Sequence, residues 1–273
     1  MDDVLVLGAT GTTGSRVAAF LDQRHVPVRR ATRSPASPGQ VRFDWNDSGT
    51  HKRALHGVSA VYLVAPVGAV DPAHAVEPFL RQALELGVRR VVQLSSSALP
   101  EGAPGLGAVH HLVRSMMPEW AVLRPSWFMQ NFTGEHLVAQ GIRDGVIVTA
   151  TGAGRVAFID ADDIAAVAGH ALTEAVPHNT DHILTGPQAL SYTDAADIVA
   201  RQVGHPVRHR PVSVDDYAAH LAAGGIPADF ATVLAALDAD IACGAEDRVT
   251  TDVEDITGRP PRTFEEFCAR SVR

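Results

Sequence analysis

Three glycines near the start of the chain have the spacing of a loop that binds a phosphate group. Gly8, Gly11 and Gly14 lie between an apolar run and an amphipathic run. In such a segment the first glycine permits a tight turn, the second lets the backbone approach a pyrophosphate, and the third lets a helix pack on a strand. The helix N-terminus adds free N–H groups and partial positive charge. A glycine-rich turn without a ligand is the alternative, but the position between strand and helix favours a dinucleotide site that includes Thr10, Thr12 and Thr13.

The next basic segment predicts which dinucleotide binds. An NAD site would place an acidic side chain at the end of the second strand for the ribose 2′-hydroxyl. No acidic residue occurs between Asp22 and Asp44, and the segment reads "RRATRS". The guanidinium of Arg33 could pair with the 2′-phosphate of NADP, and Ser34 could add a hydroxyl donor. The alternative is that these arginines are only solvated, but the missing acid favours NADP(H).

A tyrosine–lysine pair that could transfer a proton is missing. In a Tyr-x-x-x-Lys pair the phenol donates a proton and the lysine lowers its pKa. This chain has three tyrosines and one lysine, and no tyrosine has lysine four residues on. His110, four residues before Arg114 on the helix expected after the fifth strand, could donate a proton near neutral pH instead. A surface or helix-entry histidine is an equally good interpretation.

Two further segments carry candidate site residues. Ser95 and Ser96 end an expected central strand, where hydroxyls would meet a ligand, although a simple turn explains them as well. We assign Ser96 to the catalytic set with His110. In "WFMQNF", Trp127 and Phe128 could form an apolar wall with Gln130 or Asn131 as its polar contact, or the segment could be core.

The order of expected elements is that of an α/β protein. Beta-type apolar runs and amphipathic runs alternate through the first half, which predicts a doubly wound parallel sheet of the Rossmann type. Ligands bind such sheets beyond the carboxyl ends of the strands. Strands are expected at 4–8, 26–32, 41–45, 59–66, 88–97 and 120–125, with helices at 12–24, 48–56, 71–87 and 110–117.

The alternation loosens after about residue 126. Strands are expected at 155–160 and 181–186, and helices at 161–172, 214–223, 227–243 and 263–270, with another helix capped by Ser191. No clear linker is present. We therefore expect an NADP-binding domain over 1–150 and a smaller C-terminal α/β substrate lobe over 151–273.

Composition excludes several classes of protein. The formal net charge of −8 argues against a general nucleic-acid binder, because phosphate binding needs a positive surface. No apolar run approaches the roughly 20 residues that a membrane helix needs. Asp2 and Asp3 stand where a signal peptide would carry positive charge, so we expect a cytoplasmic protein.

Cysteine and histidine patterns favour no further site. Cys243 and Cys268 are far apart and fit reduced thiols better than a disulfide. The 13 histidines include pairs with i, i+4 spacing, such as His178 and His182, but these lie beside proline in loop-like segments. That spacing gathers ligands on a helix, so we expect no metal site.

Four segments together resemble one protein family. "GATGTTG", "LRPSWFMQNF", "AFIDADDIAAVA" and "TGRPPRTFEEF" resemble the NmrA-like group of atypical short-chain dehydrogenases/reductases over essentially the whole chain. Within it, the chain is most similar to the branch of fungal ergot-alkaloid dehydrogenases, which reduce an iminium ion with NADPH. The resemblance implies cofactor contacts from the glycine loop, Arg33, Val64, Ala65, Pro66 and the serines 95–97. It also implies that "PSWFMQN" lies against nicotinamide and substrate, so Pro125 and Trp127 join the predicted contacts, as do Asp44 and Trp45.

The function predicted from these residues is reduction with NADPH. We expect a small, cyclic or aromatic substrate of the iminium or quinone type, and a homodimer is possible. The alternatives are a redox sensor that binds NADP(H) without turnover, and non-redox chemistry on the same fold.

Overall fold

The chain forms two compact units. The computed structural model describes residues 3–69 and 71–272. Unit 1 comprises Met1–Pro125 and Ala161–Ile183, and unit 2 comprises Ser126–Asp160 and Leu184–Arg273. This division differs from the expected boundary at residue 150, because a helix and a strand that follow that position pack into unit 1.

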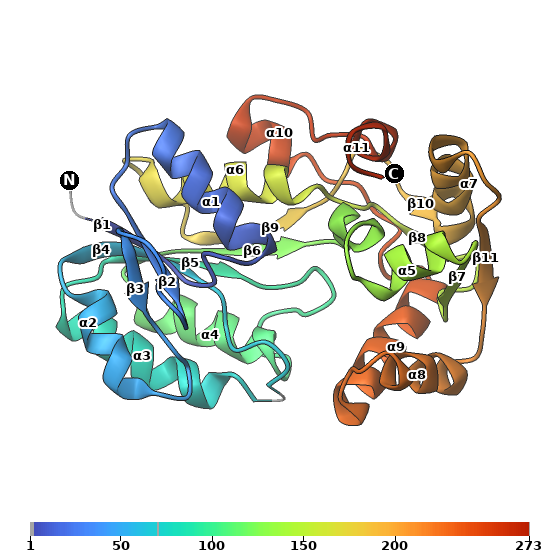
Figure 1. Cartoon of the computed structure of the whole chain (residues 1–273). Helices are drawn as coiled ribbons and strands as arrows, with labels where there is room; N and C mark the ends of the chain where they lie inside the picture. The colour runs from blue at the N-terminus through green and yellow to red at the C-terminus, as the bar shows by residue number, and fades with distance from the viewer. Residues whose placement is uncertain (1–2, 70, 273) are drawn as a thin grey trace. The chain divides into compact units, whose positions relative to one another are not determined.

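A sheet of seven strands forms the centre of unit 1 within the described residues (Figure 1). Its order is β3-β2-β1-β4-β5-β6-β9, and the pairings from β3 to β6 are parallel. β9 also runs parallel to β6, since the Asn179 N–H donates to the Trp120 carbonyl and the Ser126 N–H to the Leu184 carbonyl. The order 3-2-1-4-5-6 defines the Rossmann fold and confirms the predicted fold class. The strands are β1 (Asp3–Val6), β2 (Val28–Thr32), β3 (Gln40–Arg42), β4 (Val58–Leu63), β5 (Arg90–Leu94), β6 (Glu119–Pro125) and β9 (Thr180–Leu184).

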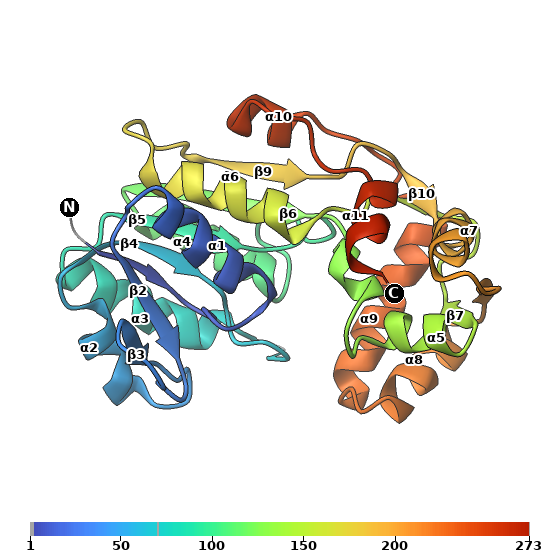
Figure 2. The same ribbon diagram turned by 45° about the horizontal axis from the view of Figure 1, so that its top comes forward.

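Helices cover both faces of this sheet. α1 (Thr12–Gln23) and α6 (Ala161–Thr173) lie side by side on one face, as Figures 1 and 2 both show. The other face carries α2 (His51–Leu55), α3 (Ala73–Glu85) and α4 (Leu106–Met116), with a 3-10 turn at Ser48–Thr50 before α2. α4 begins four residues before the expected start at 110.

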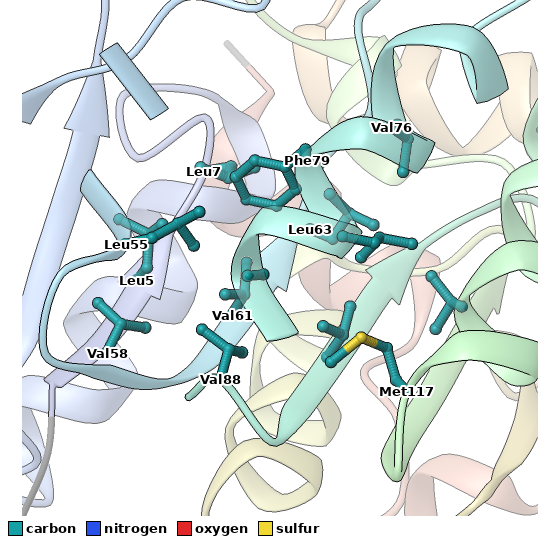
Figure 3. Packing of buried hydrophobic residues seen from close by; sticks show 14 of the residues in the cluster. Leu5, Leu7, Leu55, Val58, Val61, Leu63, Val76, Phe79, Val88 and Met117 are labelled. Atoms are coloured by element: carbon teal, nitrogen blue, oxygen red, sulfur yellow. The ribbon is translucent and has the colours of Figure 1, made fainter. Parts of the chain in front are cut away.

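The alternation of side chains along the strands builds the core of unit 1. Leu5, Leu7, Leu63 and Phe79 belong to one buried cluster, and Figure 3 shows Leu7 beside the ring of Phe79 and Leu5 near Leu55. Phe79 is 1% exposed, and burial of such a side chain stabilises the fold by about 1.5–3 kcal/mol. The core therefore fixes the strands from whose carboxyl ends the glycine loop and its neighbours emerge.

Unit 2 is a smaller α/β assembly with two short ladders. β8 (Arg155–Val156) pairs antiparallel with β10 (Leu190–Ser191), and β11 (Arg208–Pro211) pairs parallel with β7 (Val146–Thr149). The expected strand at 155–160 shrinks to the two residues of β8, while β7, β11, α5 (Leu137–Arg143) and α10 (Asp252–Thr257) were not expected. Its elements are a 3-10 turn (Met129–Phe132), α5 (Leu137–Arg143), β7 (Val146–Thr149), β8 (Arg155–Val156), β10 (Leu190–Ser191), α7 (Tyr192–Val203), β11 (Arg208–Pro211), α8 (Val214–Ala223), α9 (Ala228–Ala242), α10 (Asp252–Thr257) and α11 (Phe264–Ser271).

Two predicted local features of unit 2 are present. Ser191 caps α7 through a capping box with Asp194, as its position before the amphipathic run predicted. Cys243 and Cys268 are both free thiols.

None of the described helices is both long and apolar enough to span a bilayer.

Candidate active site

The glycine loop has the geometry that a pyrophosphate requires. Gly8 follows β1 with φ of +62°, a conformation that side chains rarely adopt. A Cβ on Gly14 would lie 2.2 Å from the Gly8 carbonyl oxygen, so the start of α1 packs directly on the turn. At Gly11 the same distance is 3.2 Å. These three environments match the separate roles of turn, close approach and helix packing.

The N-terminus of α1 is open to an anion. Gly11 is the N-cap residue, no side chain caps the helix, and its first turn contains no acidic residue. The N–H groups of Thr12 and Thr13 therefore face no competing carboxylate of their own helix. Thr13 is 5% exposed, whereas Thr12 is exposed.

A groove of about 530 Å³ extends from this loop along the strand ends of unit 1. It brings together ten of the predicted cofactor residues, which is what parallel strands with a common carboxyl edge should do. These are Gly8, Thr10, Gly11, Arg33, Ser34, Asp44, Trp45, Val64, Ala65 and Pro66.

Ion pairing distinguishes Arg33 from the two arginines before it. Arg29 pairs with Asp3 at 2.6 Å and also donates to two backbone carbonyls, and Arg30 pairs with Asp22. Arg33 lines the groove, is exposed, and makes no ion pair with a described residue. Its guanidinium is thus available to an anionic ligand.

Asp44 and Trp45 close the groove beside β3. The Trp45 indole N–H donates to the Val64 carbonyl at 3.2 Å, which ties this segment to the end of β4. The Asp44 carboxylate accepts the Asn46 N–H at 3.0 Å. Asn46 and Val67 also line the groove but were not predicted. Each directly follows a predicted residue in the sequence, and that position was the only indication the sequence offered.

The serines after β5 lie outside the residues that line this groove. The Ser95 N–H continues the ladder by donating to the Leu123 carbonyl at 2.7 Å, while its buried hydroxyl has no partner among described residues. The Ser96 hydroxyl accepts the Ala98 N–H at 3.3 Å, which is the turn that the alternative interpretation expected. Pro125, at the end of β6, accepts from the Ser97 N–H.

His110 is a buried residue of α4. It is 2% exposed and its ring lies 6.1 Å from that of Trp120, at the start of β6. Desolvation lowers its pKa, while Asp181 and Glu101 act in the opposite direction. Its Nδ1 atom is buried with no hydrogen-bond partner among described residues. The structure therefore places His110 among packed side chains and not in the wall of the groove.

The segment after β6 divides between core and pocket. Trp127 and Asn131 line a pocket of about 300 Å³ in unit 2. Met129 is 1% exposed in the apolar core, and the Gln130 amide donates to Asp160 at 2.8 Å. Phe128 forms a bridge with Ile159 and does not line the pocket. The core interpretation therefore holds for Met129, while contact of Trp127 and Asn131 with a ligand stays a prediction.

Three further residues that line this pocket were not predicted. Tyr192 begins α7, Tyr217 lies on α8 and Asp238 lies on α9. Asp238 shares the buried face of α9 with Ala231, Ala235 and Ile241. An acidic residue at helical spacing among apolar residues is the pattern by which the sequence could have indicated it.

Two of the histidines meet although they lie in no helix. His178 Nδ1 and His182 Nε2 are 2.9 Å apart, and His178 Nε2 lies 3.0 Å from the Glu174 carboxylate. The i, i+4 spacing therefore brought the rings together through the turn before β9. Within 3–69 and 71–272, no three histidine, cysteine or acidic side chains gather as a metal site.

Known proteins were compared with the chain. A family model described as NAD(P)H-binding matches residues 8–175. The chain is 47% identical over 269 residues to the uncharacterized oxidoreductase YesF of Bacillus subtilis, covering 97% of this chain and 94% of the relative. It is 38% identical over 279 residues to agroclavine dehydrogenase of Claviceps fusiformis, covering 97% and 96%. NADPH-dependent quinone oxidoreductase QOR2 of Escherichia coli, solved with NADPH, has the same fold, with a TM-score of 0.83, 24% identity and coverage of 98% and 99%.

The chain therefore belongs to the NAD(P)H-binding family of oxidoreductases. The predicted resemblance, including that to the ergot-alkaloid dehydrogenases, is confirmed, as is an NAD(P)(H) cofactor.

Proposed function

We propose that the protein is a reductase that uses NADPH to reduce a small, flat, delocalised electrophile. The observation that carries the choice of cofactor is the free guanidinium of Arg33 in a groove whose neighbouring arginines are already ion-paired. A 2′-phosphate would give Arg33 the bidentate partner that it lacks. No acid follows β2 to favour the hydroxyl of NAD instead.

The described residues fit this cofactor. Gly8, Gly11 and the N-terminus of α1 would hold the pyrophosphate, and Arg33 with Ser34 would hold the 2′-phosphate. Thr12, Thr13 and Gly14 stay in the predicted set as the first turn of α1. When bound, NADPH supplies a hydride. Roles for Ser95, Ser96, Pro125 and Trp127 toward the cofactor remain proposals.

The absence of a Tyr-x-x-x-Lys pair restricts the electrophile. A neutral ketone that gains a hydride becomes an alkoxide, which needs a proton or a strong donor at its oxygen. An iminium carbon avoids this charge, because the arriving electron pair neutralises the cation and the C=N pair moves onto nitrogen. A quinone spreads the charge over its ring and takes a proton from solvent. Trp127 and Asn131, in the pocket of unit 2, would contact such a molecule, while Phe128 and Gln130 would support them.

The cofactor is tested by titrating NADPH and NADH into wild-type protein and two variants. We expect NADPH to bind about 10 to 100 times more tightly, as a charge-assisted bidentate contact predicts. Arg33→Ala should abolish this preference. Arg42→Ala, an exposed arginine of β3 outside the groove lining, is the control and should retain it. Equal affinities for both cofactors in wild-type protein would overturn the choice of NADPH.

The substrate class is tested by following NADPH absorbance with three sets of acceptors. Cyclic iminium ions and quinones should be reduced, and simple aliphatic ketones should react at least about 100-fold more slowly. Brisk ketone reduction would contradict the argument from the missing pair. Tight NADPH binding without turnover of any acceptor would favour the alternative of a redox sensor. A cytoplasmic location and a homodimer stay predictions.

A further inference from the structure

The pocket of unit 2 contains an acidic group in an aromatic setting. Trp127, Tyr192 and Tyr217 contribute rings to its lining, and Leu221 and Leu237 contribute aliphatic walls. Neither lysine nor arginine is among the described residues that line it. Its volume of about 300 Å³ accommodates a ligand of two fused rings.

Three polar groups of this pocket have unused hydrogen-bonding capacity. Asp238 is 4% exposed, and its Oδ2 accepts the Ala150 N–H at 2.9 Å, while Oδ1 accepts no hydrogen bond from any described residue. The hydroxyl groups of Tyr192 and Tyr217 likewise make none within the described chain. Tyr192 is 3% exposed. None of these three oxygens is among the fully buried unpartnered atoms of the described chain, so each reaches the open space of the pocket, where a ligand can pair with it.

Asp238 occupies a position that folding alone would give to an apolar residue. It lies on the buried face of α9 between Ala235 and Ile241. Burial raises its pKa to about 7, against the effect of the hydrogen bond from Ala150. Burial also raises the pKa of both tyrosines, and the nearby charge of Asp238 raises it further. An ionised Asp238 is therefore costly in the free protein and would be stabilised by a cation.

We propose that Asp238, with Tyr192 and Tyr217, forms a specificity site for a flat aromatic ligand that carries a positively charged nitrogen. The carboxylate supplies the countercharge, the phenols accept or donate at its edge, and the ring of Trp127 contributes a cation–π face. A neutral or anionic ring system of the same shape binds less well, because it leaves the carboxylate buried without a partner. This site deepens the proposed function, on which it rests for the link between the ligand and turnover.

Binding is measured without turnover, so that its failure is distinct from failure of the proposed function. The full chain, free of cofactor, is titrated calorimetrically with N-methylquinolinium and with quinoline, which is neutral at pH 8 and nearly the same shape. We expect at least about tenfold tighter binding of the cation. The ratio of the two affinities is measured without cofactor, so it does not depend on whether the protein binds NADPH or reduces a substrate.

Two variants separate charge from shape. Asp238→Asn keeps an acceptor for the Ala150 N–H, and should reduce the cation preference to about onefold while quinoline affinity changes less than about twofold. Glu135→Gln removes an exposed carboxylate at the rim of the same pocket and should keep the preference. Retained quinoline affinity also shows that the Asp238→Asn variant is folded. Equal binding of both probes by wild-type protein, binding of neither, or an unchanged preference in Asp238→Asn would overturn the proposal.

The pH dependence of cation binding is a further, independent test of the role of Asp238. Cation affinity should rise between pH 6 and pH 8 as Asp238 ionises, and this rise should vanish in Asp238→Asn. The other titratable groups that line the described part of this pocket are Tyr192 on α7, Tyr217 on α8, and Glu135 and His136 before α5. The phenols stay neutral in this range, and desolvation lowers the pKa of His136 although part of its ring is exposed. A cation affinity that is flat with pH would contradict the assignment to Asp238.

Discussion

The three glycines of the phosphate loop differ in what a side chain would meet. At Gly14 a Cβ would lie 2.2 Å from the Gly8 carbonyl oxygen and 2.7 Å from its carbon, both rigid backbone atoms. At Gly11 the contact is 3.2 Å, which a shift of a few tenths of an ångström relieves. Gly14 is therefore required mainly for folding, whereas Gly11 is required mainly for the approach of a ligand.

We predict that Gly14→Ala loses about 2–4 kcal/mol of unfolding free energy, because the start of α1 must move off the turn. Gly11→Ala should lose less than about 1 kcal/mol, yet bind NADPH at least about tenfold more weakly, since the backbone no longer reaches the pyrophosphate. Denaturant unfolding and cofactor titration measure the two effects. Gly14→Ala with wild-type stability would contradict the packing role of this glycine.

His110 allows a test of a buried polar group through pH. Desolvation lowers its pKa in the folded protein, so the unfolded chain takes up a proton first as pH falls. The stability that neutral His110 provides is therefore complete above its ordinary pKa of about 6.5 and is lost as pH falls below it.

We predict that the unfolding free energy of His110→Leu at pH 7 lies within about 1 kcal/mol of the wild-type value, because the imidazole Nδ1 makes no hydrogen bond with a described residue that the substitution could remove. The variant should become relatively more stable as pH falls from 7 to 5. Thermal unfolding at both pH values checks this. The proposed catalytic role requires, in addition, that turnover falls more than about tenfold with NADPH affinity unchanged.

At the scale of elements, the segment "TGRPPRTFEEF" has two structural functions in unit 2. Thr263 caps α11 and forms a capping box with Glu266. Arg262 pairs with Asp160, whose side chain is completely buried and also accepts from Gln130. The segment thus fixes both the start of a helix and an ion pair of the buried Asp160 carboxylate.

We predict a larger loss for the ion pair than for the cap. Arg262→Ala should lower the unfolding free energy by about 3–5 kcal/mol, since it removes an ion-pair partner from a buried carboxylate. Thr263→Ala should cost about 1 kcal/mol. Chemical denaturation of both variants compares them, and Arg201→Ala, an exposed partner of Glu265, is a control that should cost less than 1 kcal/mol. Equal losses from Arg262→Ala and Thr263→Ala would contradict the ion-pair argument.

At the scale of the whole molecule, the order of segments decides which fragments can fold. Ten of the thirteen residues of α6 are buried, and α6 packs on α1 and on the sheet. A fragment that ends at residue 150 lacks both α6 and β9, so the part of the sheet face beside α1 that α6 covers is exposed and the edge strand beside β6 is missing.

We predict that the fragment 1–150 does not unfold cooperatively and binds ANS, because the surface that α6 covers is exposed. Residues 1–125 joined to 161–183 by about ten glycine and serine residues should fold and bind NADPH, since all groove-lining residues belong to unit 1. Circular dichroism during heating and cofactor titration distinguish them. A cooperatively folded 1–150 fragment would contradict this division.

The sequence by itself determined the features that depend on short-range rules. The glycine spacing after a strand, the alternation of strands and helices, and the cap at Ser191 each depend on neighbours within a few residues. The Rossmann order followed, because a parallel sheet with this rhythm has few alternative connections. The glycine loop, Arg33 and Ser34 could be placed together for the same reason, since strand ends share one edge, whereas Val64, Ala65 and Pro66 were implied by the family resemblance.

Only the tertiary structure decided which of these residues are free to act. Arg29, Arg30 and Arg33 look alike in the sequence, but partners distant along the chain occupy the first two. "DHILTG" was assigned to the second half, yet β9 joins the first sheet, because pairing depends on edges and not on chain position. Asp238 could be recognised as a pocket residue only in the structure. The free energy of burying an ionised carboxylate depends on its surroundings, and non-local packing determines those surroundings.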